Sequence, residues 1–377
     1  MSRLRRPRTS QHSPASTSFA AISTSSTPHF NTSRDSSDSS AYAAPSRIVT
    51  NGALTDLDGL CGLTAIQTRP DGTGGDLEIS LNSRLTDLAG LARLEQVAGT
   101  LRIDNNSALT STQGLSGLTT VGVALRVRGN PALESLRGLE RLAAGSKIEI
   151  FDNDGLVDLC GLHNLTVVDS LAVIANDGLQ TLWGAHNLER AIVEVDIGAN
   201  DGLVDLIGLQ RLSDVPKLKV RSNDALQSLA GLDALAEVKT LAVYGNDALL
   251  DWQAPAKLIA VQHLELCGND GLTSLSATNL AVDRLSVIYN DVLGDAAGEA
   301  YAASLQVSTP KIARNSPPPY ADLSPCPWIG DRTCDEEAAC FEWSCILCNH
   351  DDCCGDMGPT AMCAPDTDAP QDCPGPI

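Results

Sequence analysis

Nine of the twelve cysteines lie close together near the C-terminal end of the chain, among acidic residues that could ligate a cation. They are Cys326, Cys334, Cys340, Cys345, Cys348, Cys353, Cys354, Cys363 and Cys373. This density predicts a disulfide scaffold in an oxidising compartment, with four disulfides of unknown pairing and one cysteine left over. The run Cys345-x-x-Cys348-x-His350-x-x-Cys353 also has the spacing of a zinc site, which is the alternative in a reducing compartment.

Aspartates recur with a fixed period in the middle of the chain, and we call them the aspartate row. They are Asp154, Asp177, Asp201, Asp224, Asp247, Asp270 and Asp291, and each directly follows an asparagine. If successive repeats stack, like charges lie about 5 Å apart and each pair costs roughly 1 kcal/mol in water. Two interpretations stay open: turn chemistry on a solvated edge, or a ladder that binds calcium, which prefers clustered carboxylate and carbonyl oxygens.

Two histidines occupy the same position in successive repeats. His163 and His186 are each followed by Asn-Leu and could ligate a metal, but no third ligand suggests itself, so we expect surface residues.

The chain has no G-x-S-x-G, no H-E-x-x-H and no phosphate-binding glycine loop. We therefore expect a protein that is not an enzyme.

An asparagine marks each of ten regular repeats, at intervals of about two dozen residues. The positions are Asn82, Asn106, Asn130, Asn153, Asn176, Asn200, Asn223, Asn246, Asn269 and Asn290. A short alternating strand such as Leu101-Arg-Ile103 precedes each asparagine, and a leucine such as Leu109 follows three residues later. This period predicts a right-handed parallel β-solenoid of about ten 23–24-residue coils, with the asparagines at one corner. A half-coil from Asn51 to Leu63 opens the array, and a short helix from Asp295 to Leu305 caps it after the last strand.

Two further repeated positions have a structural explanation. Two residues after the leucine that follows the asparagine, every repeat has Asp, Ser or Thr, from Asp56 and Asp87 to Asp251 and Ser274. Such side chains accept a backbone N–H at a turn or helix start. The asparagine either adopts a left-handed turn or satisfies backbone groups inside the corner.

The repeat array resembles the receptor L domain, the leucine-rich β-helical ligand-binding unit of insulin- and EGF-type receptors. The motif N-x-x-L-x-x-L-x-G-L followed by an L-x-[VI] strand carries the resemblance, which covers residues 48–315. The resemblance implies that variable outward strand positions bind a ligand. The candidates for this ligand-binding face are Arg102, Arg126, Arg128, Phe151, Ile174, Lys219, Arg221 and Tyr244. Unconstrained variation at these positions is the alternative.

The cysteine-rich segment resembles a Lin-12/Notch repeat, a small calcium-binding module. Cys326-x-x-x-x-Asp331-x-x-Cys334-Asp335, later closed by Asp352-Cys353, carries this resemblance, although the spacing of the central cysteines departs from the family. The resemblance implies Asp331, Asp335 and Asp352 as calcium ligands. No cofactor is required elsewhere in the chain.

The sequence divides into four parts. Residues 1–47 form a disordered Ser/Thr-rich segment, 48–315 the solenoid, 316–325 a proline-rich linker and 326–377 the acidic cysteine-rich module. The first segment lacks the apolar centre of a secretory signal, and its Arg- and Ser-rich composition also fits an organelle transit peptide. The cysteines nevertheless predict a secreted or cell-surface protein.

Charge and composition limit the functional classes. The net charge of −21 argues against nucleic-acid binding, and no run is long and apolar enough to span a membrane. The first hypothesis is a binding scaffold whose sheet face contacts an extracellular protein or glycan. The alternative is a calcium-stabilised structural or adhesion component, and an enzyme with its site in the cysteine module is the least favoured. The oligomeric state is left open.

Overall fold

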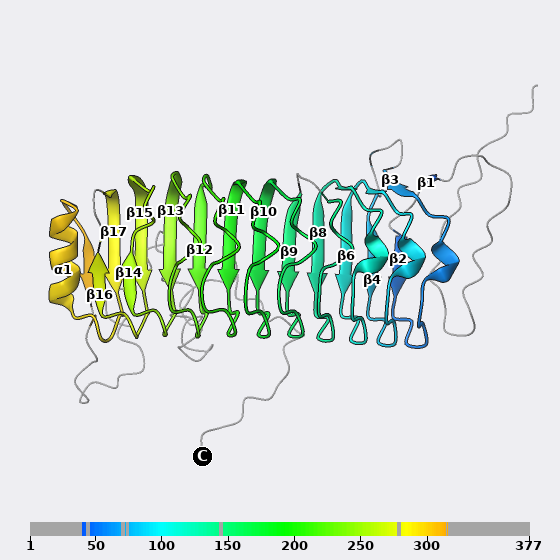
Figure 1. Ribbon diagram of the computed structural model, residues 1–377, viewed down its shortest axis with the longest axis horizontal. Coiled ribbons are helices and arrows are strands. Elements are labelled where there is room, and N and C mark those ends of the chain that lie inside the picture. The colour runs from blue at the N-terminus through cyan, green and yellow to red at the C-terminus, as the bar shows by residue number, and fades with distance from the viewer. Residues whose placement is uncertain are drawn as a thin grey trace, which may run out of the picture. The chain divides into compact units, whose positions relative to one another are not determined.

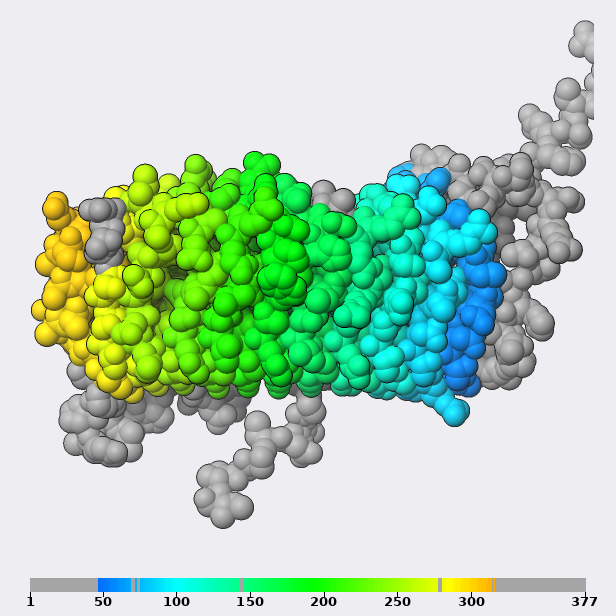
Figure 2. Space-filling view, in the orientation of Figure 1, coloured from blue at the N-terminus to red at the C-terminus, as the bar shows by residue number. Residues whose placement is uncertain are grey.

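The computed structural model describes residues 40–42, 46–68, 72, 75–142, 146–276, 280–313 and 315 of the chain. The chain divides into two units, Met1–Ser316 and Pro317–Ile377, and all described residues belong to the first. In this unit the chain forms a parallel β-solenoid of about ten turns (Figure 1). The space-filling view shows successive coils in contact along its length (Figure 2). The linker 316–325 and the cysteine module 326–377 lie outside the described residues.

One twelve-stranded parallel sheet runs the length of the solenoid. Its strands are β2 (Ser46–Val49), β4 (Leu77–Ser80), β6 (Thr100–Asp104), β8 (Ala124–Arg128), β9 (Lys147–Phe151), β10 (Val167–Ile174), β11 (Arg190–Gly198), β12 (Lys217–Arg221), β13 (Val238–Tyr244), β15 (Ala260–Cys267), β17 (Ala281–Ile288) and β18 (Lys311–Ala313). Inward positions pair with one another from strand to strand, so Leu101 of β6 pairs with Leu125 of β8 and Ile103 pairs with Val127. Between β10 and β11 the register shifts by one residue, between Val168 and Ser170. The predicted stack of parallel strands is confirmed, and β2 and β18 extend it at its two ends.

Smaller elements form the rest of each coil. A second parallel sheet contains β1 (Ser40–Tyr42), β3 (Ala65–Gln67), β5 (Gln96–Val97) and β7 (Thr120–Val121), and a third pairs β14 (Asp251–Gln253) with β16 (Ser274–Ser276). Three short 3-10 helices, η1 (Asp58–Leu60), η2 (Ala89–Leu91) and η3 (Gln113–Leu115), lie in the early coils. Elsewhere the coils return through turns.

The core is a column of aliphatic side chains that repeats from coil to coil. In the coil that begins at Asn200, the leucines Leu203, Leu206, Leu209 and Leu212 all have no solvent exposure. The glycine between them is required by close approach, because a Cβ on Gly208 would lie 2.2 Å from the carbonyl oxygen of Leu182 in the preceding coil. Burial of one such leucine stabilises the fold by roughly 1.5 to 3 kcal/mol.

A ladder of buried asparagine side chains joins every coil to the next, and we call it the asparagine ladder. The Oδ1 of Asn200 accepts the backbone N–H of Asn176 at 3.2 Å and the Nδ2 of Asn176 at 3.1 Å. The Nδ2 of Asn200 in turn donates to the carbonyl oxygen of Val173 at 3.0 Å and to Oδ1 of Asn223 at 3.2 Å. The same pattern runs from Asn51 to Asn315. Each side chain therefore satisfies backbone groups that the corner would leave unpaired.

The left-handed residue at this corner is not the asparagine but the residue before it. Thr50, Leu81, Ala175, Ala199 and Ser222 have φ between 50° and 60°. The N–H of Ala199 donates to the carbonyl of Arg221 at 2.9 Å, which continues the sheet hydrogen bonding into the turn. Of the two roles expected for the asparagine, the structure shows the second, satisfaction of backbone groups.

The repeated Asp, Ser or Thr accepts a backbone N–H in most coils, as predicted. Asp205 Oδ1 accepts the N–H of Ile207 at 2.9 Å, and Asp87 Oδ1 accepts that of Ala89 at 2.9 Å. The position differs at the last two repeats, where Asp251 and Ser274 begin the paired strands β14 and β16 and hydrogen-bond to each other. There the local strand pairing replaces the cap.

The C-terminal end of the stack is closed by α1 (Asp295–Ser304). The helix was expected after the last strand, but β18 follows it, so α1 replaces the turn segment of one more coil. Asp295 Oδ1 accepts the backbone N–H of Asn315 at 2.8 Å and its Nδ2 at 3.1 Å, and thus takes the place of the next asparagine. Buried Trp252 donates to the hydroxyl of Tyr301 on α1 at 2.6 Å.

Replacing Asn200 by Ala should strongly destabilise the solenoid. The change removes the partners of the Asn176 N–H and the Val173 carbonyl, and each orphaned buried group costs about 1 to 3 kcal/mol. Denaturant unfolding should therefore show a loss of about 2 to 6 kcal/mol, similar to the 2 to 5 kcal/mol expected for Leu206→Ala. The matched control Asp201→Asn changes the exposed neighbour and should be nearly neutral; equal effects of the two changes would contradict the ladder.

Candidate functional site

The outward side chains of the twelve-stranded sheet form two rows that run along the solenoid, and we call this surface the strand face. The first row contains Glu78, Arg102, Arg126, Glu149, Ala172, Asp196, Lys219, Ala242 and Glu265. The second contains Ser80, Asp104, Arg128, Phe151, Ile174, Gly198, Arg221, Tyr244 and Cys267. All eight residues predicted for a ligand-binding face therefore stand in these two rows.

On one side of β10, Arg126 and Arg128 of β8 reach forward to the coil of β9, and Lys147 of β9 itself adds a third base. Arg126 Nε pairs with Glu149 Oε2 at 2.8 Å, and Lys147 Nζ pairs with the other oxygen of the same carboxylate at 2.8 Å. These two bases hold the pKa of Glu149 below its usual value even though burial acts to raise it. Arg128 Nε pairs with Asp152 at 3.0 Å at the edge of the sheet.

On the other side of β10, basic side chains of β12 reach back to β11. Arg221 pairs with both carboxylate oxygens of Asp196, at 3.0 and 3.3 Å. Lys219 Nζ lies 3.7 Å from Glu194 and 4.0 Å from Asp196. A Cβ on Gly198 would lie 2.9 Å from Cγ of Arg221, so the missing side chain leaves the space that Arg221 crosses. The charged groups thus converge on β9 and β11.

Between these two sets of ion pairs lies an uncharged area that we call the central patch: Phe151, Ala172, Ile174 and Gly198. Register places Phe151 next to Ile174 and Ile174 next to Gly198. Phe151 and Ile174 are half-buried, and Ala172 is buried. The central patch is therefore a small apolar area of the sheet framed by paired charges.

Two of the predicted face residues stand apart from the central patch. Tyr244 has only 3% exposure, so it offers almost no contact area. Arg102 makes no salt bridge within the part of the chain that the structure describes, and it neighbours Asp104. Cys267, in the same row as Tyr244, is buried and disulfide-bonded, whereas Cys61 and Cys160 are free thiols.

Asp104 is a carboxyl group whose surroundings disfavour its charge. Burial raises its pKa to about 6, although Arg126, Arg102 and Arg128 act in the opposite direction. Its Oδ1 is buried and has no hydrogen-bond partner. The neighbouring arginines are directed toward Glu149 and Asp152 instead.

The histidine pair and the aspartate row are the candidate metal ligands that lie in the described ranges. The rings of His163 and His186 stack at 6.5 Å between centroids. No group of three or more His, Cys, Asp or Glu side chains that could hold a metal ion occurs among the residues described. The aspartates do interact as expected for stacked like charges: burial and then Asp224 and Asp177 raise the pKa of Asp201. The predicted calcium ligands Asp331, Asp335 and Asp352 and the nine cysteines lie outside the described residues.

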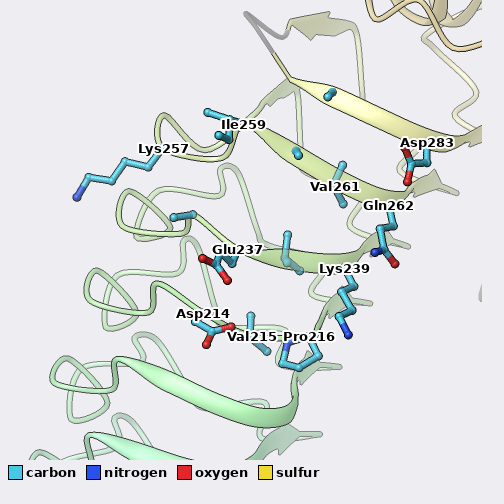
Figure 3. Close-up of a pocket in the computed structure, with 14 residues that line it drawn as sticks. Asp214, Val215, Pro216, Glu237, Lys239, Lys257, Ile259, Val261, Gln262 and Asp283 are labelled. Carbon is cyan, nitrogen blue, oxygen red and sulfur yellow. The ribbon is translucent and has the colours of Figure 1, made fainter.

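A cavity of about 600 Å³ is lined by residues that precede β12 and by the first residues of β13, β15 and β17 (Figure 3). Of the labelled lining residues, Asp214 and Glu237 lie toward one side and Lys239 toward the other, while the side chain of Lys257 extends away from the rest (Figure 3). Val215, Pro216 and Val261 contribute to its apolar lining. The cavity brings together none of the predicted site residues. Pro216, which lacks an N–H and precedes the short strand β12, was the one local signal for an irregularity there.

Asp104→Asn should stabilise the protein at neutral pH and have no effect in acid. The pKa of Asp104 is raised in the folded state, so its ionisation costs stability as the pH rises from about 4 through about 6. The melting temperature of the variant should therefore exceed that of the parent at about pH 7.5 and equal it near pH 4. A variant that melts lower at neutral pH would show that the carboxylate is stabilised by the arginines.

Asp224→Ala should leave the melting temperature unchanged or slightly higher without calcium, because it removes a like charge from the aspartate row. The pKa of Asp201 should fall toward its ordinary value, since the charge of Asp224 adds to burial in raising it. Carboxyl titration followed by NMR measures this directly. Destabilisation as large as that of Leu206→Ala would contradict the turn role of this aspartate.

The described part of the chain holds no helix long and apolar enough to cross a membrane. Its one α-helix, α1, has ten residues. Comparison of the chain with protein-family models, with curated proteins and with solved structures gives no match.

Proposed function

We propose that the chain is a non-enzymatic extracytoplasmic scaffold that binds a protein ligand through its strand face, with a glycan as the alternative ligand. The central patch between two convergent sets of ion pairs is the observation that carries this proposal. Aromatic and aliphatic side chains surrounded by a polar rim are typical of the energetically important part of a protein interface.

The ordered backbone and side chains of the strand face support the same function. Phe151, Ala172 and Ile174 project from strands that are hydrogen-bonded on both sides, so a ligand meets an ordered surface. The rim is ordered as well, because Arg221 binds Asp196 with two contacts and crosses over Gly198. Pre-organised side chains lose little conformational entropy when a partner binds, which leaves more of the contact energy for affinity.

We further propose that the solenoid is of the receptor L-domain-like, leucine-rich type. The repeated N-x-x-L-x-x-L-x-G-L motif and the strand that follows it support this assignment. In such a scaffold the corner and core positions are constrained in every coil, while the outward rows are free to vary. The change from Arg126 and Glu149 to Ala172 and back to Asp196 along one row is the kind of variation that this function requires.

The alternative is a calcium-stabilised structural or adhesion component, and the interaction among the aspartates is the observation in its favour. The raised pKa of Asp270, caused by burial and then by Asp291 and Asp247, is a cost that a bound cation would remove. Calcium-dependent melting of the full chain, lost in Asp270→Asn, would support this function. Ligand binding by the strand face, in contrast, requires no dependence of the melting temperature on calcium.

Ile174→Arg should abolish ligand capture without lowering the melting temperature, because it places a charge in the centre of an apolar contact. Phe151→Ala should weaken capture at least tenfold through the loss of an aromatic contact. The control Gln227→Arg adds the same charge at an exposed position that follows the asparagine corner and should leave capture unchanged. A photoreactive group at residue 174 should then cross-link the captured protein. If the protein still captures its ligand after Ile174→Arg but not after Gln227→Arg, the ligand binds on the other side of the coils.

A further inference from the structure

A second exposed apolar area lies on the side of the coils that follows the asparagine corner, and we call it the Trp183 patch: Val157, Cys160, Trp183, Val204 and Ile207. Val157 is 43% exposed, Trp183 49%, Val204 43% and Ile207 40%. Large apolar side chains exposed together, rather than singly, mark interaction sites on soluble proteins. None of these residues belongs to the strand face.

Direct backbone bonds between coils make this patch continuous. The N–H of Leu159 donates to the carbonyl of Trp183 at 2.8 Å, and the N–H of Leu182 donates to the carbonyl of Ile207 at 3.2 Å. Gln180, three residues before Trp183, donates its N–H to the carbonyl of Val157 at 3.0 Å. The five side chains therefore stand on three successive coils about 5 Å apart.

Trp183 is held in place at the centre of the patch. Its ring stacks on His186 with centroids 4.4 Å apart and an interplanar angle of 18°, and the ring of His186 also stacks with that of His163 at 6.5 Å. Its backbone N–H donates to Oγ1 of Thr181 at 3.2 Å. A tryptophan that is ordered before binding loses little entropy on contact, and tryptophan is the side chain most enriched among strong interface residues.

Six aspartates border the patch on these coils and the next. Asp154, Asp177, Asp201 and Asp224 belong to the aspartate row, and Asp158 and Asp205 cap the turns at Cys160 and Ile207. None of the six forms a salt bridge within the ranges that the structure describes. Burial raises the pKa of Asp201, and Asp224 and Asp177 raise it further, so negative charge is concentrated here. Apolar contact and uncompensated negative charge thus occur side by side.

We propose that the Trp183 patch is a second docking surface, which binds a basic peptide segment carrying an aliphatic or aromatic side chain between lysines or arginines. The apolar side chain packs on Trp183 and Ile207, and the cations lie over the aspartate row. A second copy of this chain is disfavoured as the occupant because its net charge of −21 repels the same surface. Nucleic acid is disfavoured for the same electrostatic reason.

Fluorescence anisotropy tests this with a labelled peptide of alternating lysine and leucine and the full chain at low ionic strength. We expect binding that weakens as salt is added. Trp183→Ala should weaken it at least tenfold with an unchanged melting temperature, and Ile207→Asn should weaken it as a second, independent variant. The double variant Asp177→Asn, Asp201→Asn should weaken binding and flatten its salt dependence.

A charge-matched control separates this site from general attraction between a cation and an acidic protein. Glu237→Gln with Asp283→Asn removes the same charge from exposed residues outside the patch and should leave the affinity unchanged. A glutamate–leucine peptide should not bind. The proposal is overturned by absence of binding to the parent protein, by equal loss in the control, by full binding to Trp183→Ala, or by Trp183-dependent self-association in sedimentation. None of these results decides whether the strand face binds a ligand, because Ile174→Arg tests that site separately.

Discussion

The hydrogen bond from the backbone N–H of one corner asparagine to the side-chain oxygen of the next is the interaction on which the solenoid depends. The corner turns the chain away from the sheet through a left-handed residue, and the N–H of the asparagine that follows is bonded by a side chain instead of by the sheet. An amide side chain supplies both an acceptor and a donor there, which neither aspartate nor leucine can do. Asp295 can end the ladder because only an acceptor is needed at the last step.

This ladder also determines what the surfaces can display. Because each coil is held to the next at the same corner, residues at equivalent positions form rows with a constant spacing. Like charges on successive coils of one row then lower the stability of the fold, and opposite charges on successive coils raise it. The strand face follows the second arrangement through Arg126 with Glu149 and Arg221 with Asp196. The aspartate row follows the first: burial raises the pKa values of Asp201 and Asp270, and the like charges of neighbouring coils raise them further.

The two candidate surfaces differ in the way their charges are balanced. Around the central patch the acids and bases are paired within the protein, so a partner gains mainly from apolar contact and from shape. Around Trp183 the aspartates lack basic partners in the described coils, so a partner gains from supplying cations. Surfaces of these two kinds select different ligands, and a rod of stacked coils can present both because its core needs only the inward leucines and valines.

The sequence by itself determined the period, the inward leucines, the parallel register, the capping role of residues such as Asp205 and the existence of a closing helix, because each is a local pattern repeated in every coil. Only the tertiary structure decided that Ala199 and not Asn200 is left-handed, that β18 follows α1, and that Tyr244 is buried. It also decided that Arg126 leans forward to Glu149 while Arg221 leans back to Asp196. The physical reason is that these contacts join side chains more than twenty residues apart, and a long side chain can reach the coil on either side of it. Trp183 shows the same limit: its exposure, and its stacking on His186, depend on how successive coils pack and are not visible in the repeat pattern.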